Sequence, residues 1–285
     1  MTPTHLVAPA KLTTSLRIVG RREDGYHLLD AEMMSLDLSD GLELIEGEDG
    51  LEVRDEVAWR GLPGTAEGEA DELATVPTGS NLVERALALC GRRARCILTK
   101  RIPSGAGLGG GSSDAAAILR WGGVSDLAVA VRLGADVPFC LIGGRSRVRG
   151  IGEFVEPLEP LDAGGMGGPA GSAGSAFLLV TPRVHVSTPI VYAAWDELQG
   201  PRGEHGNDLE PAALQAYPGL RWWRDVMGAA TGQRPRLAGS GGTWYCEGQM
   251  EQLVELADQI RAEIVAGRES ALVTVAKTVG LPEAG

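Results

Sequence analysis

The chain has 285 residues, of which 44% are hydrophobic and 22% charged, a composition typical of a globular protein with one large or two ordinary domains. Acidic residues outnumber basic ones by 38 to 26, and the net charge of −12 argues against general binding to nucleic acid or to an anionic membrane. Four cysteines without C-x-x-C spacing, no long apolar run and no signal-peptide pattern predict a reduced, cytoplasmic protein.

The first half of the chain is expected to begin with β-hairpins, because apolar and β-branched residues alternate between turn signals. Strands are predicted at Thr4–Val7, Leu12–Val19, Leu28–Leu38 and Leu42–Ile45, followed by an acidic surface loop at 61–79. The pattern then predicts a helix over Asn81–Cys90 capped by Ser80, a strand at Arg95–Lys100, a glycine loop at Gly105–Gly111, a helix over Ser112–Trp121, a helix from Ser125 and Asp126 to Gly134, and a strand at Val137–Ile142.

The second half follows a low-complexity segment at 162–175, which is expected to be flexible. A strand is predicted at Ala176–Thr181 and a helix from Thr188–Pro189, with helices near 208–215, 218–230 and 249–265 and strands near 235–238, 243–247 and 271–275. Hairpins in place of regular βαβ units indicate an α+β fold. We expect two domains, 1–150 and 151–285.

The segment from Lys100 to Asp114, KRIPSGAGLGGGSSD, carries the strongest local signal. Glycines between a strand and a helix let backbone N–H groups converge on a phosphate, and the hydroxyls of Ser112 and Ser113 can bind phosphate or magnesium. No lysine follows the glycines, which excludes a P-loop. The spacing Gly105-x-Gly107-x-x-Gly110 matches the fingerprint of dinucleotide-binding folds. However, Arg101–Ser104 separates the strand from the loop, and no second parallel strand that ends in an acidic residue follows. A tight turn alone poorly explains three consecutive glycines, although both weaker interpretations stay open.

At Pro103–Ala116 the sequence PSGAGLGGGSSDAA resembles the second motif of the GHMP kinases. Pro9-Ala-Lys11-Leu12 is similar to the first motif of this superfamily, and Leu237–Thr243 (LAGSGGT) to its glycine-rich third motif. The resemblance implies an ATP-dependent kinase with an N-terminal domain like ribosomal protein S5 and a ferredoxin-like C-terminal domain. The site would lie in the cleft between them.

Further segments resemble the branch of this superfamily whose acceptor is the diphosphocytidyl ester of methylerythritol, an isoprenoid precursor. They are Gly20–His27 (GRREDGYH), Leu133–Phe139 (LGADVPF), Thr188-Pro189 and Asn207–Glu210 (NDLE), in the expected order. The resemblance implies transfer of the γ-phosphoryl group of ATP to the 2-hydroxyl group of that substrate. ATP and Mg²⁺ would be the cofactors, and the protein would be a monomer or a weak homodimer that binds no nucleic acid or membrane.

The resemblance also implies roles for individual residues. Asp136 would accept the proton of the acceptor hydroxyl, and Lys11 would stabilise the carboxylate and the developing alkoxide. ATP would be bound by Asn81, Lys100, Pro103, Ser104, Gly105, Ala106, Gly107, Leu108, Gly109, Gly110, Gly111, Ser112 and Ser113, with Ser113 also a candidate Mg²⁺ ligand. The acceptor would be bound by Lys11, Thr13, Tyr26, His27, Asp136, Thr188, Gly239, Ser240 and Gly241, with Tyr26 and His27 holding the cytosine ring.

Each of these residues also has a purely structural interpretation. Asp136 could cap a turn, Asn81 could cap a helix, Tyr26 and His27 could belong to an ordinary hairpin turn, and Thr188 to a helix cap. The basic residues Arg92, Arg93, Arg95, Lys100 and Arg101 form a cluster that fits a solvated face better than a triphosphate site.

Two residues depart from the family pattern. Thr13 replaces an asparagine, which puts the geometry of acceptor contact in question, and Trp244 stands where smaller residues are common and could reshape the pocket. Alternatives are therefore another GHMP small-molecule kinase, a catalytically weakened relative that binds nucleotide, and, as the weakest, an NAD-dependent oxidoreductase. Intact Lys11 and Asp136 argue against loss of activity.

Overall fold

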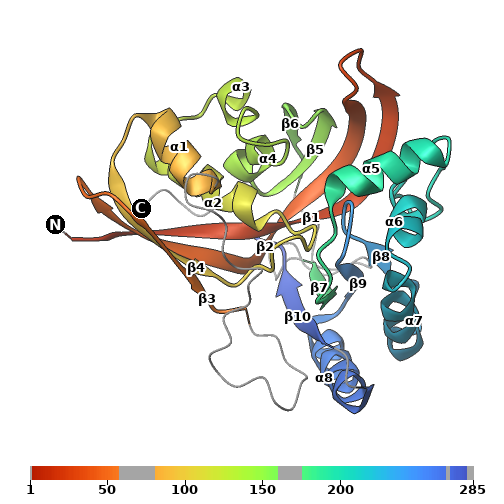
Figure 1. The fold of residues 1–285 in the computed structure, drawn as a ribbon. Helices are drawn as coiled ribbons and strands as arrows, with labels where there is room; N and C mark the ends of the chain where they lie inside the picture. Colours follow the sequence, from red (N-terminus) through yellow and green to blue (C-terminus); the bar gives the residue numbers. More distant parts are fainter. Residues whose placement is uncertain (1, 58–80, 160–174, 268–269, 281–285) are drawn as a thin grey trace.

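Two β-sheets, each covered by helices, organise residues 2–57, 81–159, 175–267 and 270–280, which this computed structural model describes (Figure 1). The first sheet contains β1 (Thr4–Arg21), β2 (His27–Glu46), β3 (Leu51–Asp55), β4 (Ala94–Lys100), β5 (Arg145–Gly150) and β6 (Phe154–Pro157). Its order is β3-β4-β2-β5-β6, with β1 paired to β2. All pairs are antiparallel except β3 and β4.

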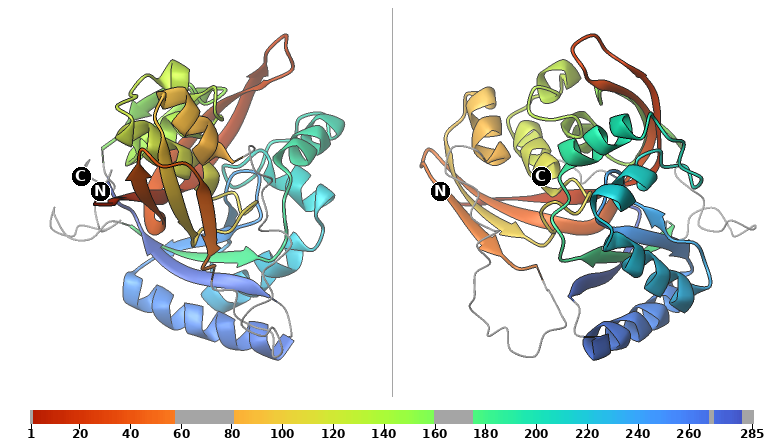
Figure 2. Two further views of the ribbon diagram at one scale, coloured as in Figure 1. Left: turned by 60° about the vertical axis from the view of Figure 1, so that its left-hand side comes forward. Right: turned by 45° about the vertical axis from the view of Figure 1, so that its right-hand side comes forward.

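The long hairpin of β1 and β2 is interrupted by bulges that flank the first motif. The register shifts between Pro9 and Lys11, and again between Thr13 and Ser15. A bulge bends a strand and changes the direction of the side chains beside it. The end of the hairpin, near His27, projects from the sheet and lies beside α5 (Thr188–Glu197) (Figures 1 and 2).

Four helices cover one face of the first sheet: α1 (Leu82–Cys90), α2 (Gly110–Trp121), α3 (Leu127–Ala130) and α4 (Val137–Ile142) (Figure 1). The central helix α2 packs on β1 and β2 and is buried from Ser113 to Leu119. Its alanines at 115, 116 and 117 allow close approach to the sheet. The N-terminal end of α2 therefore has a fixed position at the edge of the sheet.

The second sheet has the order β10-β7-β9-β8 and is antiparallel throughout. It consists of β7 (Ala176–Pro182), β8 (Arg236–Leu237), β9 (Trp244–Gly248) and β10 (Ala271–Lys277). The helices of this half are α5, α6 (Glu210–Ala216), α7 (Leu220–Thr231) and α8 (Met250–Gly267). Figure 2 shows α7 and α8 on the side of this sheet that faces away from the first.

The two sheets meet through an apolar cluster and through backbone bridges. Leu12, Met34 and Ile102 from the first half pack with Phe177 and Tyr245 from the second. Backbone bridges join Leu36 to Thr278 and Leu16 to Asn207. This core fixes the second half against the strand that carries the first motif.

The predicted α+β architecture is confirmed. The four strands predicted before residue 46 are wrong as separate strands, because they form the two continuous strands β1 and β2, and the helix predicted to end at Gly134 spans only Leu127–Ala130. The strand predicted at Val137–Ile142 is wrong, because these residues form α4, with a proline in the first turn where a helix tolerates it. Strands β3, β5 and β6 were not predicted. The helix predicted to start at Ser112 starts at Gly110, and Asn81 caps α1.

Several predictions fall on residues outside the described ranges. These are Ser80, the loop at 61–79 and the segment 162–175 up to residue 174. The domain boundary near residue 150 stays a prediction, and the last strand of the first sheet ends at Pro157. Among the described helices, none is both long and apolar enough to span a bilayer.

Candidate active site

The glycine loop between β4 and α2 is fixed at its start by Asp40. This buried carboxylate accepts hydrogen bonds from the backbone N–H groups of Arg101 (2.5 Å) and Ile102 (2.8 Å) and pairs with the Lys100 ammonium. A carboxylate with several donors has little freedom to move. The chain therefore leaves β4 in one direction toward the start of α2.

Two positions in the loop have no room for a side chain. A Cβ at Gly107, where φ is +78°, would lie 2.6 Å from the carbonyl oxygens of Ala238 and Gly241. A Cβ at Gly109, where φ is +68°, would lie 2.6 Å from Cγ of Lys11. These glycines bring the loop into direct contact with the first and third motifs.

Helix α2 begins at this loop without a side-chain cap at Gly109. The backbone N–H groups of its first turn have no partner within the helix, and the helix dipole adds partial positive charge at the same end. Gly110, Gly111 and Ser112 of this turn line the site cavity. A phosphate group is the ligand that such a helix end accommodates best.

Lys11 and Asp136 form an ion pair beside this helix end, where Lys11 packs against Gly109. Lys11 Nζ lies 3.2 Å from Asp136 Oδ2 and donates a 3.1 Å hydrogen bond to Thr13 Oγ1. The Lys11 side chain is 6% exposed and that of Asp136 is 30% exposed, so the carboxylate has access to the cavity. In such a pair the carboxylate can accept a proton from a bound ligand, and the adjacent ammonium can stabilise the negative charge that develops on that ligand.

The third glycine-rich motif closes the site from the second half of the chain. Gly239 and Ser240 line the cavity, and the hydroxyls of Ser240 and Thr188 are 2.8 Å apart. Thr243 Oγ1 donates to the carbonyl of Ala106 in the glycine loop (2.7 Å). The two glycine-rich loops are thus hydrogen-bonded to each other beside Lys11.

These groups surround a cavity of about 410 Å³, which is large enough for a nucleotide-sized ligand. Of the residues predicted for the site, the cavity is lined by Lys11, Thr13, Lys100, Pro103, Ser104, Gly105, Ala106, Gly107, Gly109, Gly110, Gly111, Ser112, Asp136, Thr188, Gly239 and Ser240. The structure therefore brings residues from five separate segments of the chain together.

Six predicted residues do not line this cavity: Asn81, Leu108, Ser113, Gly241, Tyr26 and His27. The Asn81 side chain caps α1 by accepting from Val83 N (2.9 Å), and Leu108 is buried in the core. The Ser113 hydroxyl is buried and donates to the carbonyl of Pro9 (2.6 Å). The predicted ligand roles of these three residues stay predictions.

The two aromatic residues of the hairpin point to different environments. Tyr26 is 61% exposed, whereas the His27 side chain is mostly buried. The His27 ring stacks on Tyr192 of α5 (4.9 Å between centroids), contacts Trp195 edge-on, and donates from Nε2 to Asp196 Oδ1 (2.8 Å). Tyr192 lines the cavity, so it connects the hairpin to the site.

Lys100 lies between two buried carboxylates at the side of the cavity. Its ammonium pairs with Asp40 and is 2.7 Å from Asp114 Oδ2, while Asp114 Oδ1 has no hydrogen-bond partner. Burial raises the pKa of Asp114 to about 7, although Lys100 opposes this shift. Burial lowers the pKa of Lys100, but Asp114 and Asp40 outweigh that effect and leave it raised.

Other cavity residues were not singled out from the sequence. They are Leu16, Leu29, Met33, Leu82, Ile102, Ala135, Tyr192 and Leu209. Most are apolar residues of strands or helices, and the sequence pattern around them predicts that they are buried but not that they line a site. Tyr192 follows Thr188 by one helical turn, which is a signal that could have placed it on the same face of α5.

The expected effect of Trp244 on the pocket is not observed. Trp244 is fully buried in β9, belongs to the main hydrophobic core and does not line the cavity. The arginines of the basic cluster form a solvated face, as expected, because they pair with nearby carboxylates, whereas Lys100 is mostly buried and lines the cavity. The pairs are Arg92–Glu46, Arg93–Asp49, Arg95–Glu52 and Arg101–Glu56.

Comparison with known proteins adds independent findings. A family model described as the GHMP kinases N terminal domain matches residues 81–144. A Paracoccus denitrificans protein named 4-diphosphocytidyl-2-C-methyl-D-erythritol kinase is 36% identical over 256 residues, which cover 84% of each chain. A Rhizobium meliloti protein of the same name is 32% identical and matches 96% of this chain and 94% of its own.

Solved structures agree with these relatives. A crystal structure of 4-(cytidine 5'-diphospho)-2C-methyl-D-erythritol kinase is similar with a TM-score of 0.68 and 29% identity, covering 97% of this chain and all of the other. Homoserine kinase from Cytophaga hutchinsonii is similar with a TM-score of 0.63 and 17% identity, covering 98% and 95% of the two chains. The second similarity shows a shared fold alone.

Proposed function

The chain belongs to the family of 4-diphosphocytidyl-2-C-methyl-D-erythritol kinases within the GHMP kinases, and we propose that it transfers the γ-phosphoryl group of ATP to the 2-hydroxyl group of that substrate. This reaction belongs to isoprenoid precursor synthesis by the methylerythritol phosphate pathway. The observation that supports it best is the ion pair of Lys11 and Asp136, which lines the same cavity as the start of α2 at Gly110.

We propose that the triphosphate lies along the glycine loop. The loop from Pro103 to Gly111 offers backbone N–H groups, and the first turn of α2 provides a positive end for phosphate oxygens. Phosphoryl transfer depends mainly on positioning and charge neutralisation, which this arrangement supplies without a P-loop lysine. Lys100, which lines the cavity, and Asn81, which caps α1 next to the cavity residue Leu82, would contact the rest of the nucleotide.

Asp136 and Lys11 would act on the acceptor. Asp136 takes the proton of the 2-hydroxyl group as its oxygen forms a bond to the γ-phosphorus. The bond from that phosphorus to the oxygen shared with the β-phosphate breaks, and ADP leaves with the electron pair. Lys11, 3.2 Å from Asp136, stabilises the negative charge that develops on the attacking oxygen.

The oxygen ligands of this cavity fit a Mg²⁺ ion that is bound mainly by the phosphate groups of the nucleotide. The described residues contain no cluster of three His, Cys, Asp or Glu that could hold a metal by themselves. Ser112 and Asp136, which both line the cavity, offer the oxygen ligands that Mg²⁺ prefers beside phosphate oxygens. When bound there, Mg²⁺ would neutralise charge on the triphosphate.

The cytosine ring would bind near the end of the β1–β2 hairpin. Tyr192 lines the cavity and stacks on His27, and Tyr26 lies next to His27 with its ring exposed. Aromatic rings bind a planar base by stacking, and a buried histidine held by Asp196 can read its polar edge. We therefore add Tyr192 to Tyr26 and His27 as a base-binding residue.

We also propose that the protein is a cytoplasmic monomer or weak homodimer with domains at 1–150 and 151–285. Its net charge of −12 disfavours nucleic acid and anionic membranes as partners.

A coupled assay of ADP release with ATP, Mg²⁺ and 4-diphosphocytidyl-2-C-methyl-D-erythritol tests this function. Asp136→Ala is expected to reduce kcat by roughly 10²–10⁴-fold, the usual contribution of a general base. Asp126→Asn is the matched control, because Asp126 only caps α3 by accepting from Ala128 N (2.8 Å). ATP binding without turnover of this acceptor would contradict the proposal and point to a different acceptor selected around Thr13.

A further inference from the structure

Asn207 connects the third glycine-rich motif to the rest of the molecule. Its Nδ2 group donates two hydrogen bonds, to the carbonyl oxygens of Leu237 (2.9 Å) and Gly239 (2.7 Å), and its Oδ1 accepts one from Leu209 N (3.0 Å). The side chain is buried and does not line the cavity. Both N–H donors and the oxygen of the side-chain amide thereby have hydrogen-bond partners within the protein.

This set of partners requires an amide. Two carbonyl oxygens need two N–H donors on one side, and a backbone N–H needs an acceptor on the other. An aspartate offers only oxygens when ionised and would face the carbonyls of Leu237 and Gly239 with like partial charge. These three partners fix the orientation of the amide, with Nδ2 toward the two carbonyl oxygens and Oδ1 toward Leu209 N.

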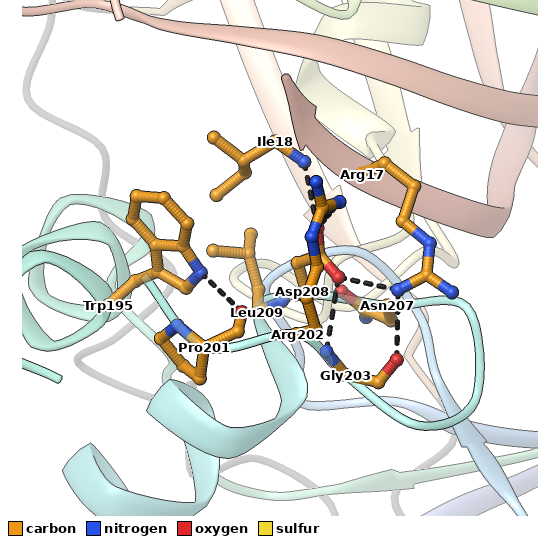
Figure 3. Close-up of polar contacts among 9 residues, drawn as sticks. All are labelled: Arg17, Ile18, Trp195, Pro201, Arg202, Gly203, Asn207, Asp208 and Leu209. Carbon is orange, nitrogen blue, oxygen red and sulfur yellow. Dashed lines mark hydrogen bonds and ion pairs between the residues drawn. The ribbon is translucent and has the colours of Figure 1, made fainter. Parts of the chain in front are cut away.

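The residue next to Asn207 fixes this point of the chain on β1. Asp208 is fully buried and accepts hydrogen bonds from Ile18 N (3.0 Å), Gly203 N (3.1 Å), Arg17 (2.6 Å) and Arg202 (2.9 Å), most of which Figure 3 shows. The backbone adds a bond from Asp208 N to the carbonyl of Leu16 (2.9 Å). Asn207 therefore occupies a fixed position relative to the strand that carries Lys11.

The loop that Asn207 holds contacts both halves of the reaction site. A Cβ at Gly239 would lie 3.5 Å from Lys11 Nζ and 3.6 Å from Thr13 Oγ1. On its other side, the carbonyl oxygens of Ala238 and Gly241 pack against Gly107 of the glycine loop. A shift of this loop would move the neighbours of Lys11 and of the phosphate-binding loop at the same time.

We propose that Asn207 is a positioning residue: its amide sets the third glycine-rich motif at the distance from Lys11 and from the glycine loop that aligns the acceptor hydroxyl with the γ-phosphoryl group. The inference rests on the proposed function for its effect on turnover. Its structural part, the fixed position of residues 237–241, holds for whichever acceptor the enzyme uses.

Asn207→Asp tests the proposal, with Arg202→Ala as control. The aspartate keeps the size and the acceptor but loses both donors. Arg202 contacts the neighbouring Asp208 from a 67% exposed side chain and is not among the hydrogen-bond partners of the Asn207 side chain. Because a misplacement of about 1 Å can reduce a rate by roughly 10²-fold, kcat of Asn207→Asp is expected to fall by that order while ATP binds with unchanged stoichiometry.

Two further readouts separate positioning from loss of folding. Amide hydrogen exchange over residues 237–243 should accelerate in Asn207→Asp and not in Arg202→Ala, whether or not the acceptor is turned over. As the pH falls, kcat of Asn207→Asp should recover in part relative to the wild type, because a protonated carboxyl group can donate one hydrogen bond, whereas Asn207→Leu should show no recovery.

The outcomes are distinct. Wild-type kcat and wild-type exchange in Asn207→Asp would overturn the proposal, as would a loss of kcat matched by an equal loss of ATP-binding sites. Absence of turnover in the wild-type protein would overturn the proposed function instead, and the exchange measurement would still decide whether Asn207 holds the loop.

Discussion

The Lys11 ammonium donates a 3.1 Å hydrogen bond to the hydroxyl of Thr13, two residues along the same bulged strand. Thr13 stands where the resemblance to the GHMP kinases led us to expect an asparagine. Its side chain is 2% exposed and packs at the base of the cavity beside Gly239. The hydroxyl of Thr13 thus helps to hold the Lys11 ammonium beside Asp136, 3.2 Å away.

Thr13→Val should reduce turnover by removing this hydroxyl while keeping the shape of the side chain. A hydrogen bond to a charged group contributes about 1.5–3 kcal/mol, so a fall in kcat of roughly 10–100-fold is expected. Thr13→Ser, which restores the hydroxyl, should recover most of the activity. The ADP-release assay measures both variants, and equal rates for the valine and serine variants would rule out this role for Thr13.

Tyr192→Ala should weaken acceptor binding without affecting ATP. The ring of Tyr192 stacks on His27 and lines the cavity, and removal of an aromatic partner typically costs about 0.5–1.5 kcal/mol beyond the lost buried area. We expect a higher KM for the acceptor, an unchanged KM for ATP, and near wild-type values for Tyr192→Phe. Steady-state kinetics with each substrate varied in turn would show the pattern, and a rise in the KM for ATP would contradict it.

Asp114 should make the folded protein less stable as the pH rises from about 4 to about 7. Its pKa is raised from 3.8 to about 7 in the folded state, chiefly by burial, so in this range Asp114 is protonated to a greater extent in the folded than in the unfolded chain. The contribution of Asp114 to the free energy of unfolding therefore decreases with increasing pH. The groups that face Asp114 are Lys100 and Asp40, with Cys96 and Cys140 nearby.

Urea unfolding of the wild type and of Asp114→Asn across this pH range isolates that contribution. The asparagine cannot ionise, so the difference in unfolding free energy between the two proteins should change steadily between pH 4 and pH 7 and level off above it. Titrating groups elsewhere cancel in the difference. A constant difference at every pH would show that Asp114 does not titrate in this range.

The sequence was sufficient to predict the parts of the site that consist of motifs. Lys11, Asp136, Thr188 and Gly239 were all expected in one site, and the structure brings them together around one cavity. Each belongs to a short segment whose composition is unusual for a plain strand or helix. The residues that hold these motifs, such as Asp40 and Asn207, were not predicted as partners, because their contacts depend on the fold of segments far apart in the chain.

The elements that were missed were ambiguous for local reasons. Val137–Ile142 is a short apolar run that fits a buried strand or a buried helix equally well, and Pro138 was the only signal for the helix. Strand β5 (Arg145–Gly150) places Ser146 and Val148 inward and arginines outward, but its charge obscured the alternation. Tyr192 became a site residue only because α5 packs beside the hairpin end that carries His27.

Asp208→Ala should destabilise the protein more than the removal of either arginine that contacts this carboxylate. The substitution leaves the N–H groups of Ile18 and Gly203 buried without a partner, at about 1–3 kcal/mol for each unpaired group. Arg17 and Arg202, 38% and 67% exposed, can turn to water instead. For Asp208→Ala we expect a loss of about 2–4 kcal/mol in unfolding free energy. For Arg202→Ala, which removes only an exposed partner of Asp208, we expect a loss of under about 1 kcal/mol. Thermal and urea unfolding would measure both, and similar losses in the two variants would mean that the exposed ion pair, and not the two backbone hydrogen bonds, carries the stabilising effect.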